Sequence, residues 1–181
     1  MKLCITGLNH RTAPIAVRER LAFKENDVAA ALSYLKGQPG VREGLILSTC
    51  NRVEVAVAAD DAVDPRQPVE NFLTQSQHLD PEWLRQYLYF YEGRDAVRHI
   101  FRVAASLDSM VVGEPQFLGQ MKAAYAIAKA TGAMNGLLDT VLTRAFSVAK
   151  RVRSETEIGE NAVSISYAAV ELAREIFGSL K

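Results

Sequence analysis

The chain has 181 residues, 49% of them apolar, which suffices for one domain with a sizeable core, or for one domain and the start of a second. Lysine plus arginine equals aspartate plus glutamate, at 21 each, so the chain lacks the overall positive charge that marks many nucleic-acid-binding proteins. Two cysteines, Cys4 and Cys50, without a signal peptide or a long apolar span, predict a cytoplasmic protein with no membrane segment and with free thiols rather than a disulfide.

The first half of the chain is predicted to alternate strands with helices. Thr12 and Pro14 are typical of a helix start, with the hydroxyl as cap and the proline in the first turn. Val53, Val55 and Val57 alternate with the period of a half-buried strand. In chain order, the predicted elements are a strand over Lys2 to Asn9, helices from Pro14 to Leu21 and from Asn26 to Lys36, strands over Leu45 to Leu47 and Val53 to Val57, a helix ending near His78, and a strand over Tyr87 to Tyr91.

The second half is predicted to be helical throughout, because its apolar residues recur at helical spacing. The helices are expected to begin at Arg94, at Glu114-Pro115, after Gly136 and after Gly159, and the last one, which carries Val163, Tyr167, Val170, Leu172 and Ile176, is expected to end at Gly178. Strands first and helices afterwards predict an α+β fold: a small mixed or antiparallel sheet with packed helices, followed by a helical layer.

The stretch Ser48-Thr49-Cys50-Asn51-Arg52 ends the apolar run over Gly44 to Leu47 with reactive side chains. Arg52 is a nearby cation that would favour the thiolate of Cys50, the nucleophilic form. A free cysteine more often packs as a small, inert apolar side chain. Position alone therefore slightly favours a structural role for Cys50.

Three further stretches occur together with this one. They are Gly7 to Pro14 (GLNHRTAP), Ser106 to Gln116 (SLDSMVVGEPQ) and Arg151 to Gly159 (RVRSETEIG). In this order, and with Ser48 to Arg52, the chain resembles the glutamyl-tRNA reductase family. The sequence departs mildly from the family pattern at Lys24, where serine is common, and at Ala56, where an aromatic residue is frequent; neither touches the expected chemistry.

The resemblance implies NADPH-dependent reduction of glutamyl-tRNA(Glu) to glutamate-1-semialdehyde, the first step of five-carbon tetrapyrrole biosynthesis. An ester accepts hydride poorly, whereas a cysteine thioester is more electrophilic and releases the tRNA before reduction. No G-x-G-x-x-G turn occurs, so no cofactor-binding residue is predicted in this chain. Residues 1–155 are interpreted as the catalytic domain and 156–181 as the start of the connection to an absent NADPH-binding domain.

By itself the chain is expected at most to form the thioester and hydrolyse it slowly. The resemblance also implies glutamate-1-semialdehyde aminomutase as a partner, and a homodimer of the full-length protein formed through an absent domain. No metal site is predicted.

The family match assigns roles to particular residues of this chain. Cys50 corresponds to the family nucleophile, and His99 to a histidine that assists as general acid or base. Arg52 suits the glutamyl side-chain carboxylate, because a guanidinium binds a carboxylate through two hydrogen bonds, and Glu114 suits the α-ammonium group. The positions that hold the substrate in the family correspond to Thr49, Arg52, Ser109, Glu114 and Gln120.

Several of these residues also have structural interpretations. Without the family match, His99 would be interpreted as a partly buried histidine beside the core. Ser109 and Glu114 flank a predicted helix boundary, where both residue types are favoured as caps. For Ser109, capping and substrate contact are equal alternatives. His10 lies in the first motif and could face the same pocket, whereas His78 is expected at the surface.

Local basic and aromatic groups are candidates for RNA contact. Arg94, Arg98 and Arg102 share one face of a predicted helix, although Glu92 and Asp95 nearby favour an ordinary solvated face. The other candidates are Lys150, Arg151 and Arg153 for phosphate, and Tyr87, Tyr89, Phe90 and Tyr91 for bases, the latter more often being strand core.

Two alternative functions belong to other classes. A non-catalytic tRNA-binding module would bind the substrate without forming a covalent adduct. An unrelated cysteine hydrolase using Cys50 and His99 would need a third group to orient the histidine, and spacing alone identifies none.

Overall fold

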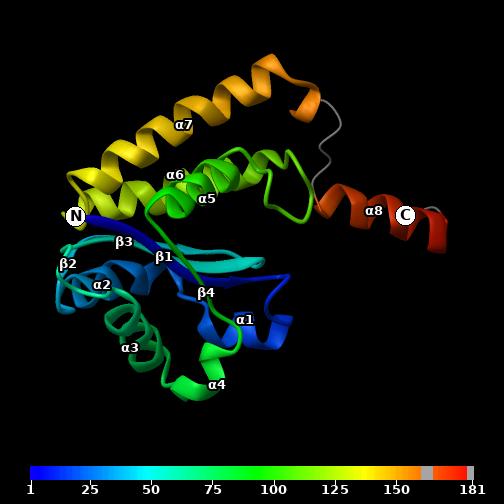
Figure 1. Ribbon diagram of the computed structural model, residues 1–181. Helices are drawn as coiled ribbons and strands as arrows, with labels where there is room; N and C mark the ends of the chain where they lie inside the picture. The colour runs from blue at the N-terminus through cyan, green and yellow to red at the C-terminus, as the bar shows by residue number, and fades with distance from the viewer. Residues whose placement is uncertain (160–164, 179–181) are drawn as a thin grey trace.

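The computed structural model describes residues 1–159 and 165–178. Its centre is one sheet whose neighbouring strands are all antiparallel, in the order β2-β3-β1-β4 (Figure 1). The strands are β1 Lys2–Asn9, β2 Val41–Ser48, β3 Arg52–Ala59 and β4 Tyr89–Glu92. Strands β1 and β2 are joined in the chain by the first two helices, but in the sheet β3 lies between them. This is the split βαβ connectivity of ferredoxin-like domains.

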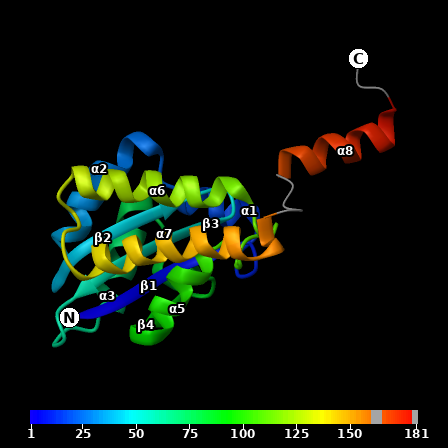
Figure 2. The same ribbon diagram turned by 90° about the horizontal axis from the view of Figure 1, so that it is seen from above.

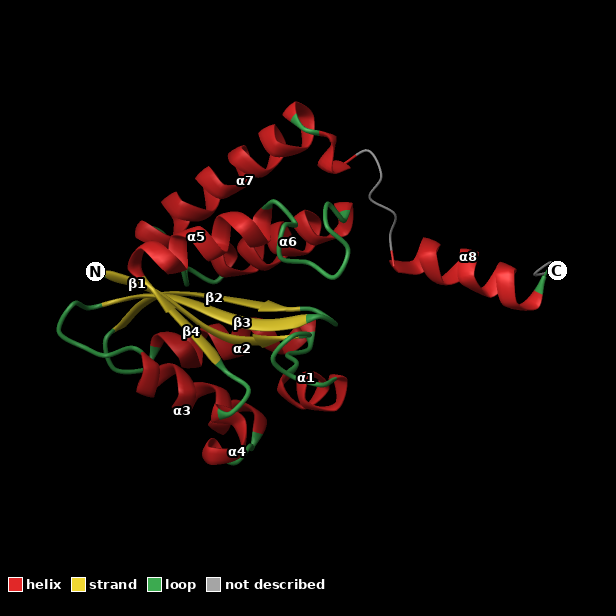
Figure 3. Cartoon of the chain, turned by 45° about the vertical axis from the view of Figure 1, so that its right-hand side comes forward, coloured by secondary structure: helices red, strands yellow, loops and turns green. Residues whose placement is uncertain are grey.

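Helices cover both faces of the sheet, as Figures 1 and 2 show. One face is covered by α1 Ile15–Leu21, α2 Glu25–Lys36, α3 Arg66–Gln77 and α4 Pro81–Arg85, and the other by α5 Gly93–Ala104, α6 Pro115–Ala130 and α7 Leu137–Glu155. A 3-10 turn at Glu157–Gly159 and α8 Ile165–Phe177 follow. The predicted α+β class, with a helical layer in the second half, is confirmed (Figure 3).

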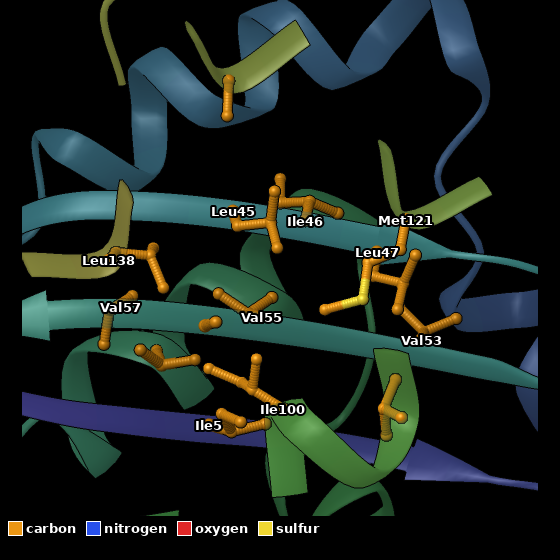
Figure 4. Packing of buried hydrophobic residues seen from close by; sticks show 14 of the residues in the cluster. Ile5, Leu45, Ile46, Leu47, Val53, Val55, Val57, Ile100, Met121 and Leu138 are labelled. Atoms are coloured by element: carbon orange, nitrogen blue, oxygen red, sulfur yellow. The ribbon is translucent and has the colours of Figure 1, made fainter. Parts of the chain in front are cut away.

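The prediction that β3 is half-buried is wrong. All eight residues of β3 are buried, because the second helical layer packs on the face that alternation alone would leave in water. Figure 4 shows Ile100 of α5, Met121 of α6 and Leu138 of α7 in the same buried apolar cluster as Ile5 of β1 and as Leu45 and Leu47 of β2. Polar residues of β3 therefore lie inside the protein, where each needs a partner.

Local signals explain most of the differences at element boundaries. Thr12 does not cap α1, since its hydroxyl bonds the backbone of Asn9 and the helix begins after Pro14. Asp80, whose side chain accepts a hydrogen bond from the Trp83 amide at 2.7 Å, caps the unpredicted α4. The strand predicted from Tyr87 begins two residues later, because the turn after α4 includes Tyr87.

The last predicted helix is present as α8. Val163, expected on its apolar face, lies outside the described residues, as does the side chain of Tyr167. Across the described ranges, no helix combines the length and the apolar character that crossing a membrane requires. The division of the chain at residue 155 stays a prediction.

Gly7 is expected to tolerate no side chain. It pairs with Glu54 in the sheet, and a Cβ built on Gly7 would lie 2.5 Å from the carbonyl oxygen of Val53 and 2.9 Å from the Cα of Glu54. Gly7→Ala should therefore destabilise the fold by about 1–3 kcal/mol, because backbone atoms of the central strand would have to move. Urea unfolding measures the effect.

Gly119 of α6 provides the matched control. A Cβ at Gly119 would have no heavy atom of the described residues within 4 Å, so Gly119→Ala should raise stability by roughly 0.5–1 kcal/mol through helix propensity. Equal effects of the two substitutions would contradict the close approach of β1 and β3 at Gly7.

Candidate active site

Cys50 lies at the tip of the turn that joins β2 to β3. The Thr49 amide donates to the Arg52 carbonyl oxygen at 2.8 Å, and the Thr49 hydroxyl accepts from the amides of Asn51 and Arg52 at 3.3 and 3.2 Å. These bonds fix the turn and leave the Cys50 side chain exposed. Thr49 therefore orients the turn through its own hydroxyl.

The alternative of a buried, inert cysteine describes Cys4 rather than Cys50. Cys4 is 1% exposed in β1, and burial, followed by the charge of Glu92, raises the pKa of its thiol to about 12. Both thiols are free. The reactive candidate is thus the exposed Cys50, as the family resemblance implies.

One cavity borders the Cys50 turn, and a second adjoins it at Phe23 and Ser48. One, of about 260 Å³, is lined by Cys50, Thr49 and Arg18, and the Arg18 Nε donates to the Cys50 carbonyl oxygen at 3.1 Å. The other, of about 210 Å³ and largely apolar, is lined in part by Gln120 of α6. Phe23 and Ser48 line both cavities. Gln120 therefore lines the cavity next to the one that Cys50 lines.

A buried cluster of charged and polar groups lies behind the turn. Its centre is Glu54 of β3, whose Oε1 accepts hydrogen bonds from the Arg52 Nη1 at 2.7 Å, from the His99 Nε2 at 2.8 Å, and from the Tyr89 hydroxyl. Burial alone would raise the pKa of Glu54, but the His99 hydrogen bond and the Arg52 charge outweigh it and lower the pKa to about 2. Burial and the charge of Glu54 raise the pKa of Tyr89 well above its ordinary value, so Tyr89 stays a donor.

Arg52 is part of this cluster and does not face Cys50. Its side chain is 1% exposed, and its guanidinium contacts Glu54, the carbonyl oxygen of Asp108, and the Asp108 carboxylate at 3.6 Å. The ring of Phe117 lies 5.2 Å from the guanidinium carbon. The expectation of a free cation beside the thiol is therefore wrong for Arg52, and Arg18 is the arginine that lines the Cys50 cavity.

His99 projects from α5 into the same buried cluster. Its ring stacks on Tyr91 with centroids 4.7 Å apart, and its Nδ1 lies 3.9 Å from the Asp108 carboxylate. His99 borders a third cavity, of about 400 Å³, which Cys50 does not line. The structure thus brings His99 together with Arg52 but places it and Cys50 at different cavities.

Ser109 and Glu114 are both buried in the segment between α5 and α6. Glu114 precedes the first residue of α6, yet its side chain makes no capping hydrogen bond, so the capping interpretation is wrong for it. The Ser109 Oγ, the Arg52 Nε and the His10 Nδ1 are buried without hydrogen-bond partners among the described residues. Unpartnered buried polar atoms are uncommon in folded proteins, and atoms of this kind suit a bound polar group.

Sequence reasoning missed the residues that organise the site. Glu54 carries the signal that could have identified it, a carboxylate within a run of strand-forming valines. Asp108, which ion-pairs with Arg11 at 2.9 Å, lies inside one of the quoted motifs. His78, by contrast, is exposed at the end of α3, as predicted.

Comparison with known proteins decides the family. Residues 6–156 match the family model described as glutamyl-tRNA(Glu) reductase, N-terminal domain. The chain belongs to the glutamyl-tRNA reductase family. It is 63% identical, over 99% of its length, to a glutamyl-tRNA reductase of Solibacter usitatus, and 53% identical, over its whole length, to glutamyl-tRNA reductase 2 of Koribacter versatilis.

A solved structure of the glutamyl-tRNA reductase from Methanopyrus kandleri is also similar. It superposes with a TM-score of 0.72 at 35% identity and covers 98% of this chain. The chain spans 43% and 41% of the Solibacter and Koribacter reductases, and 41% of the Methanopyrus chain. The match is thus to the first of the regions that make up a glutamyl-tRNA reductase.

Proposed function

We propose that the Cys50 turn forms a thioester with the glutamyl group of glutamyl-tRNA(Glu), as the covalent step of a glutamyl-tRNA reductase. The observation that supports this most strongly is the exposed thiol at a turn held by Thr49. The Cys50 Sγ attacks the ester carbonyl carbon, an S–C bond forms, and the C–O bond to the terminal ribose breaks. The released tRNA oxygen takes up a proton.

His99 is proposed to exchange that proton, and the structure supplies the group that orients its ring. The Glu54 carboxylate accepts from His99 Nε2, which fixes the orientation of the imidazole ring. Glu54 is also the third group that a cysteine hydrolase would require. Hydrolase chemistry is therefore the second candidate, and the fate of the thioester distinguishes the two functions.

Recognition of the glutamyl group is proposed to use Thr49, Arg52, Ser109, Glu114 and Gln120. The unpartnered Oγ of Ser109 and Nε of Arg52 support a polar ligand near both. Glu54 and Asp108 hold the two terminal nitrogens of the Arg52 guanidinium, and Nε, which has no partner among the described residues, is proposed to bind the substrate carboxylate.

Reduction of the thioester requires a hydride donor, which we propose to be NADPH. The described residues do not fit this cofactor: the connections from β1 to α1 and from β3 to α3 contain no glycine, and a dinucleotide pyrophosphate needs a glycine-rich strand-to-helix turn. No hydride-transfer step is assigned to these residues. Association with glutamate-1-semialdehyde aminomutase and dimerisation of the full-length protein stay predictions.

Intact-mass analysis after acid quenching tests the thioester. Mixed with glutamyl-tRNA(Glu), the chain should gain the mass of one glutamyl group, and Cys50→Ser should gain none. Cys4→Ser is the matched control and should react like the unchanged chain, because Cys4 is buried with a raised pKa. Slow release of glutamate should follow in the absence of a hydride donor.

Each other outcome has a defined meaning. An adduct on Cys50→Ser would contradict the assignment of the nucleophile. Binding of glutamyl-tRNA without any adduct would favour a non-catalytic tRNA-binding module. Rapid turnover of glutamyl esters that do not contain tRNA would favour the hydrolase.

A further inference from the structure

One polar cavity, which Cys50 does not line, has no ligand assigned to it by thioester formation at Cys50. Its volume is about 400 Å³, within the range of roughly 300–1,000 Å³ typical of small-molecule sites. It opens between the end of β1, strand β4 and helix α5, and His99 and Asp108 lie at its inner wall. The outer wall carries Arg98 and Arg102 of α5.

These two arginines are available to an anionic ligand. Arg98 and Arg102 are exposed, and neither forms an ion pair within the described part of the chain. Arg11, which also lines the cavity, is already paired with Asp108. Arg94 lies one helical turn before Arg98 but does not line the cavity.

The cavity also presents aromatic and hydrogen-bonding surfaces. Tyr91 and Tyr89 of β4 are half-buried and line it, which places phenol rings beside the two arginines. Asp95 lines the same space and can accept hydrogen bonds from ribose hydroxyls or from a base amino group. Cations, aromatic rings and acceptors around one cavity are the groups that bind a nucleotide of a single strand.

A backbone hydrogen bond links the loop at this cavity to the Cys50 turn. The His10 amide, in the loop that lines the cavity through Asn9 and Thr12, donates to the Asn51 carbonyl oxygen at 2.9 Å. Asn51 is the residue after Cys50. An acyl group attacked by Cys50 is joined through one ester oxygen to the terminal ribose of its tRNA, so that nucleotide must lie in the space next to the turn.

We infer that the cavity lined by Arg98, Arg102 and Tyr91 binds the 3′-terminal nucleotide of the tRNA substrate. Arg98 and Arg102 contact its phosphate, and Tyr91 packs against its sugar or base. This rests on the proposed function and extends it by naming where the leaving group binds. The cavity at Cys50 itself is less suited, because Arg18 there is accompanied by Glu19 and no aromatic ring other than that of Phe23 is among its lining residues.

A binding cycle with shortened tRNA tests the inference. Uncharged tRNA(Glu) and the same RNA lacking its 3′-terminal nucleotide are titrated against the unchanged chain, against the double variant Arg98→Gln with Arg102→Gln, and against Arg94→Gln. Removal of the nucleotide should weaken binding to the unchanged chain about tenfold or more. The double variant should bind the full tRNA about as weakly and lose little further affinity for the shortened RNA.

Arg94→Gln is the control on the same helix and should keep the full difference in affinity between the intact and the shortened RNA. All variants should have similar melting temperatures. If the double variant weakens both RNAs by the same factor, the arginines contact tRNA elsewhere and the inference is overturned, while the proposed function stands. If the unchanged chain binds neither RNA, the proposed recognition of tRNA by this chain fails, and the inference fails with it.

Discussion

Glu54→Gln is expected to destabilise the fold by about 3–5 kcal/mol. The Glu54 carboxylate is buried and is the acceptor for Arg52, His99 and Tyr89 at a single oxygen. Its replacement by a neutral amide leaves Asp108 as the one carboxylate paired with the Arg52 guanidinium among the described residues of this buried site. An unbalanced buried charge costs far more than the loss of an exposed ion pair.

The same substitution should remove part of the acid sensitivity of the protein. The pKa of Glu54 is about 2 in the folded state, against an ordinary value of 4.5, so the unfolded state binds the proton more readily. The stability contributed by Glu54 is therefore complete above pH 4.5 and is lost as the pH falls toward 2, by on the order of 3 kcal/mol. In Glu54→Gln this contribution is absent at every pH.

Urea unfolding at neutral pH, at pH 4.5 and at pH 3 measures both effects. Glu82→Gln is the matched control, because Glu82 forms an exposed pair with Arg85 on α4, and its replacement should change stability by less than about 1 kcal/mol. Similar pH dependence of Glu54→Gln and the unchanged chain would show that other carboxylates govern acid unfolding.

Glu43→Ala is expected to destabilise the fold by about 2–5 kcal/mol. Glu43 is buried in β2 next to an irregularity in the strand register, and its carboxylate accepts from the amides of Leu138 at 2.6 Å and Asn135 at 3.2 Å. These amides belong to the start of α7, whose own N-cap residue, Gly136, makes no side-chain cap. The Glu43 carboxylate therefore caps α7 from another element. Its negative charge also interacts favourably with the positive N-terminal end of the helix dipole.

Hydrogen exchange locates this effect. The Leu138 amide should lose protection in Glu43→Ala by more than global destabilisation explains, whereas Glu43→Gln keeps an acceptor oxygen and should show an intermediate loss. Gly136→Ala is a second probe, since a Cβ there would lie 2.6 Å from the Glu43 Oε1. Unchanged protection at Leu138 would contradict the capping role of Glu43. Because α7 packs on α5, the loss of protection should extend to amides of α5, the helix that carries His99.

Local sequence patterns were sufficient for most of the elements. Strand β1 has the predicted bounds, and Gly37 and the Glu114-Pro115 pair mark a helix end and a helix start as expected. Patterns of this kind act within a few residues, so they do not depend on the rest of the fold. The family motifs likewise located the Cys50 turn, whose thiol is exposed in the structure.

The environment of the charged residues could not be predicted in this way. Arg52 was expected to be free to bind a substrate carboxylate, and alternation left Glu54 on a solvated face. Both are buried because α5 and α6, far along the chain, cover that face of β3 and supply His99 and Phe117 as neighbours. Burial by a distant layer has no local signature.

The sequence by itself thus determined most of the strands and helices, the family resemblance and the position of the thiol, since these depend on short-range periodicity and on motifs. Only the tertiary structure decided that Glu54 joins Arg52, Tyr89 and His99, and that His99 and Cys50 border different cavities. The physical reason is that a charge is held inside a protein only where an opposite charge or a donor meets it. Packing between elements that lie far apart in the chain determines which of these groups come into contact.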